Sequence, residues 1–105
     1  MSILYEVNAE FADASIADAW AKWVLDEHIA DVVAAGASSG RLVRIDGDDD
    51  VPRWSAQYEF TSRAALDAYL RDHAPRLREE GTRRFPSEKV RYQRRVGEIQ
   101  ETPLG

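Results

Sequence analysis

The sequence contains no cysteine among its 105 residues. This absence excludes a disulfide scaffold, a thiol nucleophile and zinc sites built from thiolates. No apolar run approaches the ~20 residues that a membrane helix needs. The first ten residues, MSILYEVNAE, lack the basic flank and the long apolar core of a signal peptide. We therefore expect a cytoplasmic protein with no membrane partner, built as one domain over residues 1–100 with a short C-terminal tail at 101–105.

Basic residues are scarce in the first part of the chain. The net charge is −5 overall, but residues 1–62 carry −8 and residues 63–105 carry +3. Affinity for nucleic acid comes from many basic contacts to phosphates, so an acidic chain argues against a nucleic-acid partner. The basic second part remains suited to a small anion or to an acidic face of another copy.

The apolar residues change period along the chain. Strict alternation, which is typical of half-buried strands, occurs near residues 3–10, in RWSAQYEF at 53–60 and in KVRYQRRV at 89–96, and RLVRI at 41–45 is a further short strand. Helical spacing runs from Ile16 to about residue 35, with a slip near His28 and a helix end at Gly36. A second helix is expected from its cap at Ser62 to an end at Gly81, with a kink caused by Pro75.

These elements follow one another in the order β-α-β-β-α-β. The order predicts an α+β ferredoxin-like fold, in which two helices cover one face of a four-stranded antiparallel sheet. The opposite face of the sheet would show mainly polar side chains, including Glu6, Asn8, Arg41 and Gln57. A two-layer monomer leaves that face in water, whereas a second copy of the chain would cover it.

Familiar metal and phosphate motifs are missing. The acidic run DGDDD at 46–50 lacks the spaced oxygen ligands and the distant glutamate of a calcium loop. The GASSG stretch at 36–40 lacks the lysine of a phosphate-binding loop and does not lead into a helix. We therefore predict neither a bound metal nor a cofactor from the motifs.

Several short stretches resemble an uncharacterised bacterial family, domain of unknown function 4286. They are ILYEV at the start, WxxW at Trp20 and Trp23, EHI at 27–29, LxxYLxxHAPxLRxEG at 66–81 and RRV at 94–96. The resemblance spans about residues 3–97, and the histidine before a helix-kinking proline is its most specific part. The chain departs from the pattern at Ala30, where a proline is expected.

That family is similar to the dimeric α/β-barrel superfamily, in which two ferredoxin-like sheets pair. Relatives there include cofactor-independent monooxygenases, haem-degrading monooxygenases and small isomerases and lyases. The resemblance implies a homodimer with a pocket between helices and sheet in each subunit. It implies no particular reaction, because one fold hosts many functions.

His28 is the candidate catalytic residue. It lies near the end of the first helix beside Asp26 and Glu27, whose carboxylates would raise its pKa and suit it to acid or base work. The alternative is a histidine that only satisfies free carbonyls at a helix end. Trp20 and Trp23 on the same helix are interpreted as core residues.

The candidate ligand-binding residues share one expected direction, toward the helix layer. They are Tyr5, Trp54, Tyr58, His73, Tyr92 and Arg94. An arginine on an apolar face needs a partner or a ligand, and tyrosine hydroxyls beside it suit a small planar or acidic molecule. The alternatives are a register slip that sends Arg94 outward and a purely structural His73.

Three functions stay open at this point. The first is a protein that binds a small ligand in this pocket, and the second is a cofactor-free enzyme of monooxygenase or isomerase type with His28 as acid or base. The third is a haem-binding or haem-degrading protein, because such relatives use an Asn, a Trp and a His, here Asn8, Trp54 and His73. Asn8 has the wrong parity for this third role.

Overall fold

The computed structural model describes residues 1–47 and 52–101. The helical and strand elements follow in chain order: β1 (Ile3–Phe11), α1 (Ala14–Trp23), the π-helical turn η1 (Val24–His28), α2 (Ile29–Ala34), β2 (Ser39–Arg44), β3 (Arg53–Phe60), α3 (Arg63–Asp72), α4 (Ala74–Arg84) and β4 (Val90–Glu98). Residues 48–50 of the acidic run and residues 102–105 of the expected tail lie outside this described part.

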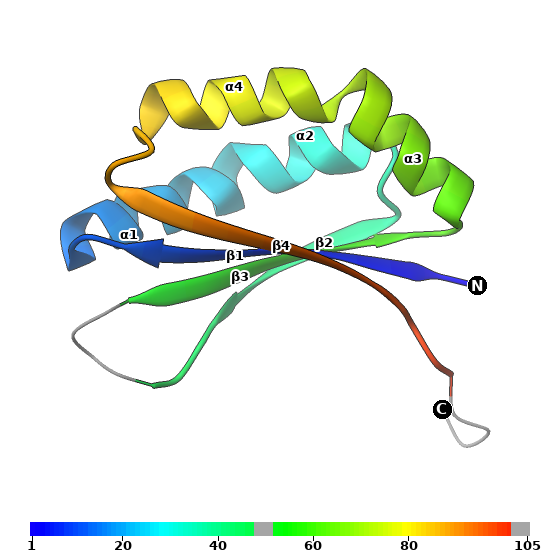
Figure 1. The fold of residues 1–105 in the computed structure, drawn as a ribbon, viewed down its shortest axis with the longest axis horizontal. Coiled ribbons are helices and arrows are strands. Elements are labelled where there is room, and N and C mark those ends of the chain that lie inside the picture. Colours follow the sequence, from blue (N-terminus) through cyan, green and yellow to red (C-terminus); the bar gives the residue numbers. More distant parts are fainter. Residues whose placement is uncertain (48–51, 102–105) are drawn as a thin grey trace.

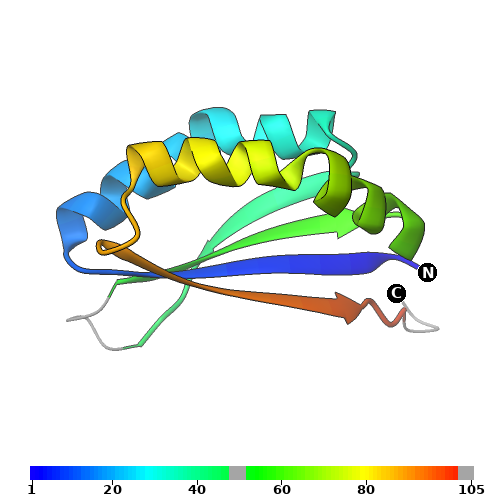
Figure 2. The same cartoon turned by 45° about the horizontal axis from the view of Figure 1, so that its top comes forward.

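The four strands form one antiparallel sheet in the order β2-β3-β1-β4. All the helices cover one face of this sheet, with α1 and α2 in one row and α3 and α4 in another (Figures 1 and 2). The order and the layers are those of a ferredoxin-like fold, which confirms the predicted class. Within residues 1–47 and 52–101, no helix is long and apolar enough to cross a membrane.

Polar caps start both helical rows. The Asp13 carboxylate accepts a hydrogen bond from the Ile16 N–H at 3.0 Å, and the Ser62 hydroxyl accepts one from the Ala65 N–H at 3.1 Å. Each cap satisfies one of the free N–H groups of a first helical turn, which stabilises such a helix by about 1 kcal/mol. The cap expected at Ser62 is confirmed, and Asp13 caps the first row.

The slip in the first helical pattern is a π-helical turn. The Ile29 N–H bonds to the Val24 carbonyl, five residues earlier. An extra residue in one turn rotates the following side chains by roughly 100°. The apolar face of α2 is therefore out of phase with that of α1, as the sequence pattern showed.

The second helical row breaks at His73, where α3 ends and α4 begins with Pro75 in its first turn. This break confirms the expected kink. The expected end at Gly81 is wrong, because α4 continues to Arg84. Gly81 is instead a buried contact point, where an added Cβ would lie 3.4 Å from the Trp23 ring.

The outer face of the sheet carries a polar row that crosses all four strands. Arg41, Gln57, Glu6 and Arg95 are paired neighbours in the sheet register. Arg41 Nε donates to Gln57 Oε1 at 2.8 Å, and Arg95 Nε donates to Glu6 Oε1 at 2.8 Å. Burial opposes ionisation of Glu6, but hydrogen bonds from Asn8 and Arg95 outweigh it, so the pKa of Glu6 is lowered. The four side chains of this row are therefore hydrogen-bonded to one another within one chain.

Candidate functional site

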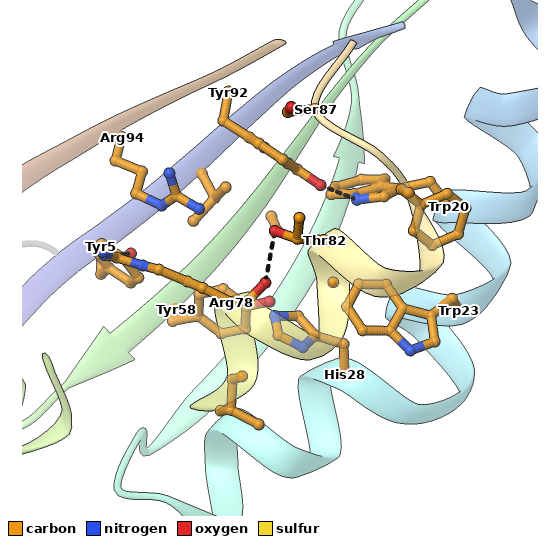
Figure 3. Close-up of a pocket in the computed structure, with 15 residues that line it drawn as sticks. Tyr5, Trp20, Trp23, His28, Tyr58, Arg78, Thr82, Ser87, Tyr92 and Arg94 are labelled. Carbon is orange, nitrogen blue, oxygen red and sulfur yellow. Dashed lines mark hydrogen bonds between the residues drawn. The ribbon is translucent and has the colours of Figure 1, made fainter. Parts of the chain in front are cut away.

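A cavity of about 260 Å³ lies between the two helical rows and the sheet. The first row, α4 with the segment after it, and three strands all contribute side chains (Figure 3). The lining residues are Tyr5, Val7, Trp20, Trp23, His28, Ala56, Tyr58, Leu77, Arg78, Gly81, Thr82, Phe85, Ser87, Tyr92 and Arg94. Aromatic and aliphatic side chains form most of this lining, which is the usual character of a small-molecule site.

Five of the seven residues singled out in the sequence line this cavity. They are Tyr5, His28, Tyr58, Tyr92 and Arg94. The sheet register pairs Val7 with Arg94 and Tyr5 with Tyr58. The inward direction inferred for Arg94 therefore holds, and a register slip does not occur.

Trp54 and His73 lie elsewhere. Trp54 packs at the edge of the core with the Arg44 guanidinium 5.9 Å from its ring centroid. His73 lies at the junction of α3 and α4, with its Nδ1 3.0 Å from the Arg76 guanidinium. Neither residue is part of the cavity lining.

The residues expected for a haem site do not come together. Asn8 donates to Glu6 Oε1 on the outer face of the sheet, whereas Trp54 packs against the core on the inner face and His73 caps a helix junction. Nothing in their arrangement within one chain forms a common pocket, so this set does not fit a haem. No cluster of three potential metal ligands occurs in residues 1–47 and 52–101.

The π-helical turn sets the position of His28. Residues five apart lie on different faces of an α-helix, where neighbours are three or four apart. The wider turn brings Trp23 and His28 onto one face, and their rings stack with centroids 4.6 Å apart and planes 25° apart. The imidazole also meets the Tyr58 ring edge-on, at 6.3 Å. Such turns are frequent at functional sites because they re-aim single side chains.

Burial lowers the pKa of His28 below its usual value, and the Arg94 guanidinium lowers it further. Asp31 and Glu80 act in the opposite direction but do not outweigh the burial. The expectation that Asp26 and Glu27 would raise this pKa is therefore wrong. Asp26 is instead paired with Lys22 at 2.6 Å, at the surface. The lowered pKa favours the neutral form of the His28 imidazole at neutral pH.

Three polar atoms of the cavity residues are buried and lack a partner. Trp23 Nε1, His28 Nδ1 and the Tyr58 hydroxyl have no hydrogen-bond partner within the part of the chain that the structure describes. Tyr58 is only 1% exposed, and its burial raises its pKa, so it stays a neutral phenol. Most buried polar groups are paired, because an unpaired one costs about 1–3 kcal/mol.

The hydroxyl groups of the other two cavity tyrosines have hydrogen-bond partners. Trp20 Nε1 donates to the Tyr92 hydroxyl at 3.1 Å, and Arg78 donates to the Tyr5 hydroxyl at 3.0 Å. The Arg94 guanidinium lies 5.1 Å from the centroid of the Tyr92 ring. Arg78, Thr82 and Phe85 were not foreseen, and only the position of Arg78 next to the buried Leu77 in the sequence hints at its place.

The fold and this cavity define a ferredoxin-like protein with an aromatic pocket under its helices. The chain belongs to the family described as domain of unknown function (DUF4286), whose model matches residues 2–99. No curated protein is a significant match to the chain.

Solved structures share the fold at low sequence identity. HapK from Hahella chejuensis has a TM-score of 0.69 at 18% identity, with 97% of this chain and 95% of that chain covered. A mutant of SnoaB, a cofactor-independent oxygenase from Streptomyces nogalater, has a TM-score of 0.67 at 14% identity, with 98% of each chain covered. A dimeric ferredoxin-like protein from an uncultured marine organism has a TM-score of 0.63 at 18% identity, with 96% of this chain and 98% of that chain covered. These likenesses establish the fold alone.

Proposed function

We propose that the chain, as a single cytoplasmic domain, binds a small organic ligand in the cavity between its helices and its sheet. The observation that carries the proposal is that His28 Nδ1 and the Tyr58 hydroxyl, two of three buried polar atoms of the lining, have no partner among residues 1–47 and 52–101, within a mainly apolar and aromatic lining. A ligand that bonds to both would offset their desolvation cost. Tyr5, Tyr92 and Arg94 complete the polar part of the proposed site.

The three tryptophans give a direct test of this proposal. The indole N–H signals of Trp20 and Trp23 report on the cavity, and that of Trp54 reports on a place outside it. Titration with small aromatic probes such as phenol, indole and benzamide is expected to shift the first two signals and leave the third unchanged. A probe set that moves none of the three would overturn the proposal.

A matched pair of variants separates the cavity from the surface. Thr82→Phe narrows the cavity from an exposed lining position, whereas Arg83→Phe adds the same ring one residue later, outside the lining. We expect the first variant to weaken probe binding and the second to leave it unchanged. Equal effects of both variants would argue against the cavity as the binding site.

We further propose that two copies pair through the outer faces of their sheets. The likeness to ferredoxin-like proteins described as dimeric supports this arrangement, and so does the internally satisfied polar row, because such a face can be covered without leaving unpaired groups. Light scattering is expected to give twice the chain mass. Val43→Glu on this face should weaken the dimer, whereas Val33→Glu on the exposed side of α2 should not. A monomer at all concentrations would contradict the pairing.

A cofactor-free enzyme is the second candidate function. A neutral, buried imidazole beside a ligand can accept a proton, and the likeness to the oxygenase SnoaB is compatible with this role through the fold alone. In this case a bound ligand is converted in aerated buffer, and His28→Gln lowers the rate by roughly 10²- to 10⁴-fold with little loss of affinity. Liquid chromatography coupled to mass spectrometry of the recovered ligand decides between the two functions. An oxygenated product differs in mass and an isomer in retention time, whereas a binding protein returns the ligand unchanged.

A further inference from the structure

The charged groups that line the cavity are of one sign. Arg78 reaches it from α4 and Arg94 from β4, and no aspartate or glutamate is part of the lining within the described residues. Figure 3 shows both guanidinium groups on the side of the cavity near Tyr5, while Trp20 and Trp23 stand on the other side. Both arginines are exposed, so the positive charge lies where the cavity meets solvent.

The neutral polar groups of the lining are mainly donors. Tyr5 and Tyr92 each accept an N–H, from Arg78 and Trp20, which leaves their own O–H groups free to donate. The Tyr58 hydroxyl has no partner among the described residues. The acceptors are fewer, namely one nitrogen of the neutral His28 imidazole and the oxygen of Thr82, whose hydroxyl donates to the Arg78 carbonyl at 3.0 Å. A complementary ligand is therefore rich in acceptors and poor in donors.

The two ends of the cavity differ in their electrostatics. Asp31 and Glu80 are close enough to His28 to oppose the lowering of its pKa, whereas Arg94 contributes to that lowering. Negative charge on a ligand is thus favoured near Arg78 and Arg94 and disfavoured near the imidazole. A carboxylate can take parallel hydrogen bonds from a guanidinium, which is the strongest common pairing of this kind.

The size and the walls of the cavity restrict the rest of the ligand. A dry cavity of roughly 150 Å³ is enough to hold benzene, so about 260 Å³ accommodates one ring with its substituents. The indoles of Trp20 and Trp23 and the ring of Phe85 supply flat apolar walls for a planar body.

We propose that the ligand of this cavity is a single-ring aromatic carboxylate, with its carboxylate at Arg78 and Arg94 and its ring among the tryptophans. The inference rests on the proposed ligand-binding function and names the chemical class that the site selects. Arg78 and Arg94 then set the specificity for an acid over its neutral analogue, and Tyr58 and His28 are left to bond a substituent on the far side of the ring.

Benzoate and benzamide form a matched pair of probes, because they differ in charge and hardly in shape. Titrations followed by the Trp20 and Trp23 indole signals should show benzoate binding at least about fivefold more tightly than benzamide. Arg94→Gln should remove most of this preference, and Arg78→Gln should reduce it. Arg91→Gln removes the same charge from the same strand but lies outside the cavity, so it should leave the preference unchanged.

The possible results separate the two proposals. Equal binding of benzoate and benzamide, or a preference that survives both Arg94→Gln and Arg78→Gln, overturns the carboxylate assignment and leaves the ligand-binding function standing. A preference lost equally in Arg91→Gln also overturns it, because general charge would then be the cause. Failure of both probes and of the neutral probes named above overturns the ligand-binding function itself.

Discussion

The imidazole of His28 stacks on the indole of Trp23 across a π-helical turn, with the ring centroids 4.6 Å apart. The stack exists because the turn contains one residue more than an α-helical turn would, which puts positions 23 and 28 on the same face. It fixes an ionisable side chain between an aromatic wall and the phenol of Tyr58. The position of the candidate acid or base thus follows from a local irregularity of the helix.

Protonation of His28 is expected to destabilise the fold. Its pKa is lower in the folded chain than in the unfolded chain, so the unfolded state binds the proton more readily over the interval between the two values. The neutral His28 side chain makes its full contribution to the free energy of unfolding above pH ~6.5. This contribution is lost as the pH falls through the pKa of the folded state, by ~1.4 kcal/mol for each unit by which folding lowers the pKa.

Chemical denaturation at a series of pH values measures this effect. The free energy of unfolding of the wild type should decrease between pH 6.5 and pH 5 more steeply than that of His28→Gln, which has no imidazole at this place. The slopes of the free energy of unfolding against pH are compared, because His28→Gln also removes the stack on Trp23 and so lowers the stability by an amount that does not depend on pH. If the free energy of unfolding depends on pH in the same way in both proteins, burial of His28 does not cause the loss of stability between pH 6.5 and pH 5.

The hydroxyl groups of two cavity tyrosines should have opposite effects on stability. Tyr92→Phe removes the acceptor of Trp20 Nε1 and is expected to lower the free energy of unfolding by about 1 kcal/mol. Tyr58→Phe removes a buried hydroxyl that has no partner in residues 1–47 and 52–101, so it should leave stability unchanged or raise it. Thermal or urea unfolding of the two variants measures the difference.

Ligand binding gives the complementary result for Tyr58. If its hydroxyl serves a ligand, Tyr58→Phe weakens probe binding although the protein is at least as stable. A Tyr58→Phe variant that is less stable than the wild type would mean that the hydroxyl has a structural partner. The hydroxyl would then not be available to bond a ligand.

Two strand glycines offer a further contrast. A Cβ at Gly40 would lie 2.9 Å from Ile29 Cγ2 and 3.0 Å from Tyr58 Cδ1, whereas a Cβ at Gly97 would meet nothing within 4 Å. Gly40→Ala should therefore cost about 1–3 kcal/mol of stability through overpacking, and Gly97→Ala should be close to neutral. Because Gly40 packs on Tyr58, its substitution should also disturb the indole signals of the cavity. Equal stability of the two variants would contradict the close packing of Gly40 in β2 against Ile29 in the first helical row.

The sequence predicts the strands, the cap at Ser62 and the inward direction of Tyr5, Tyr92 and Arg94, because alternation and helical spacing are local properties. It misplaces the end of the second helix at Gly81, because the close contact with Trp23 that this glycine permits is a tertiary feature. Trp54 and His73 lie on the inner side of the sheet, as the site residues do. Their distance from the cavity depends on the helix break and the sheet register, which the sequence pattern does not reveal. The sign of the His28 pKa shift depends on burial, which adjacent carboxylates in the sequence do not reveal.

The protonation of His28 tests the central claim most directly. The chain has two histidines, so His73→Gln leaves a single imidazole whose titration can be followed by NMR without ambiguity. We predict a pKa below 6.5 for His28, with a value that rises when benzoate occupies the cavity and neutralises the guanidinium of Arg94. A His28 pKa of 6.5 or above that does not change on addition of benzoate would contradict this claim, because His28 would then be a solvated helix residue with no cavity beside it.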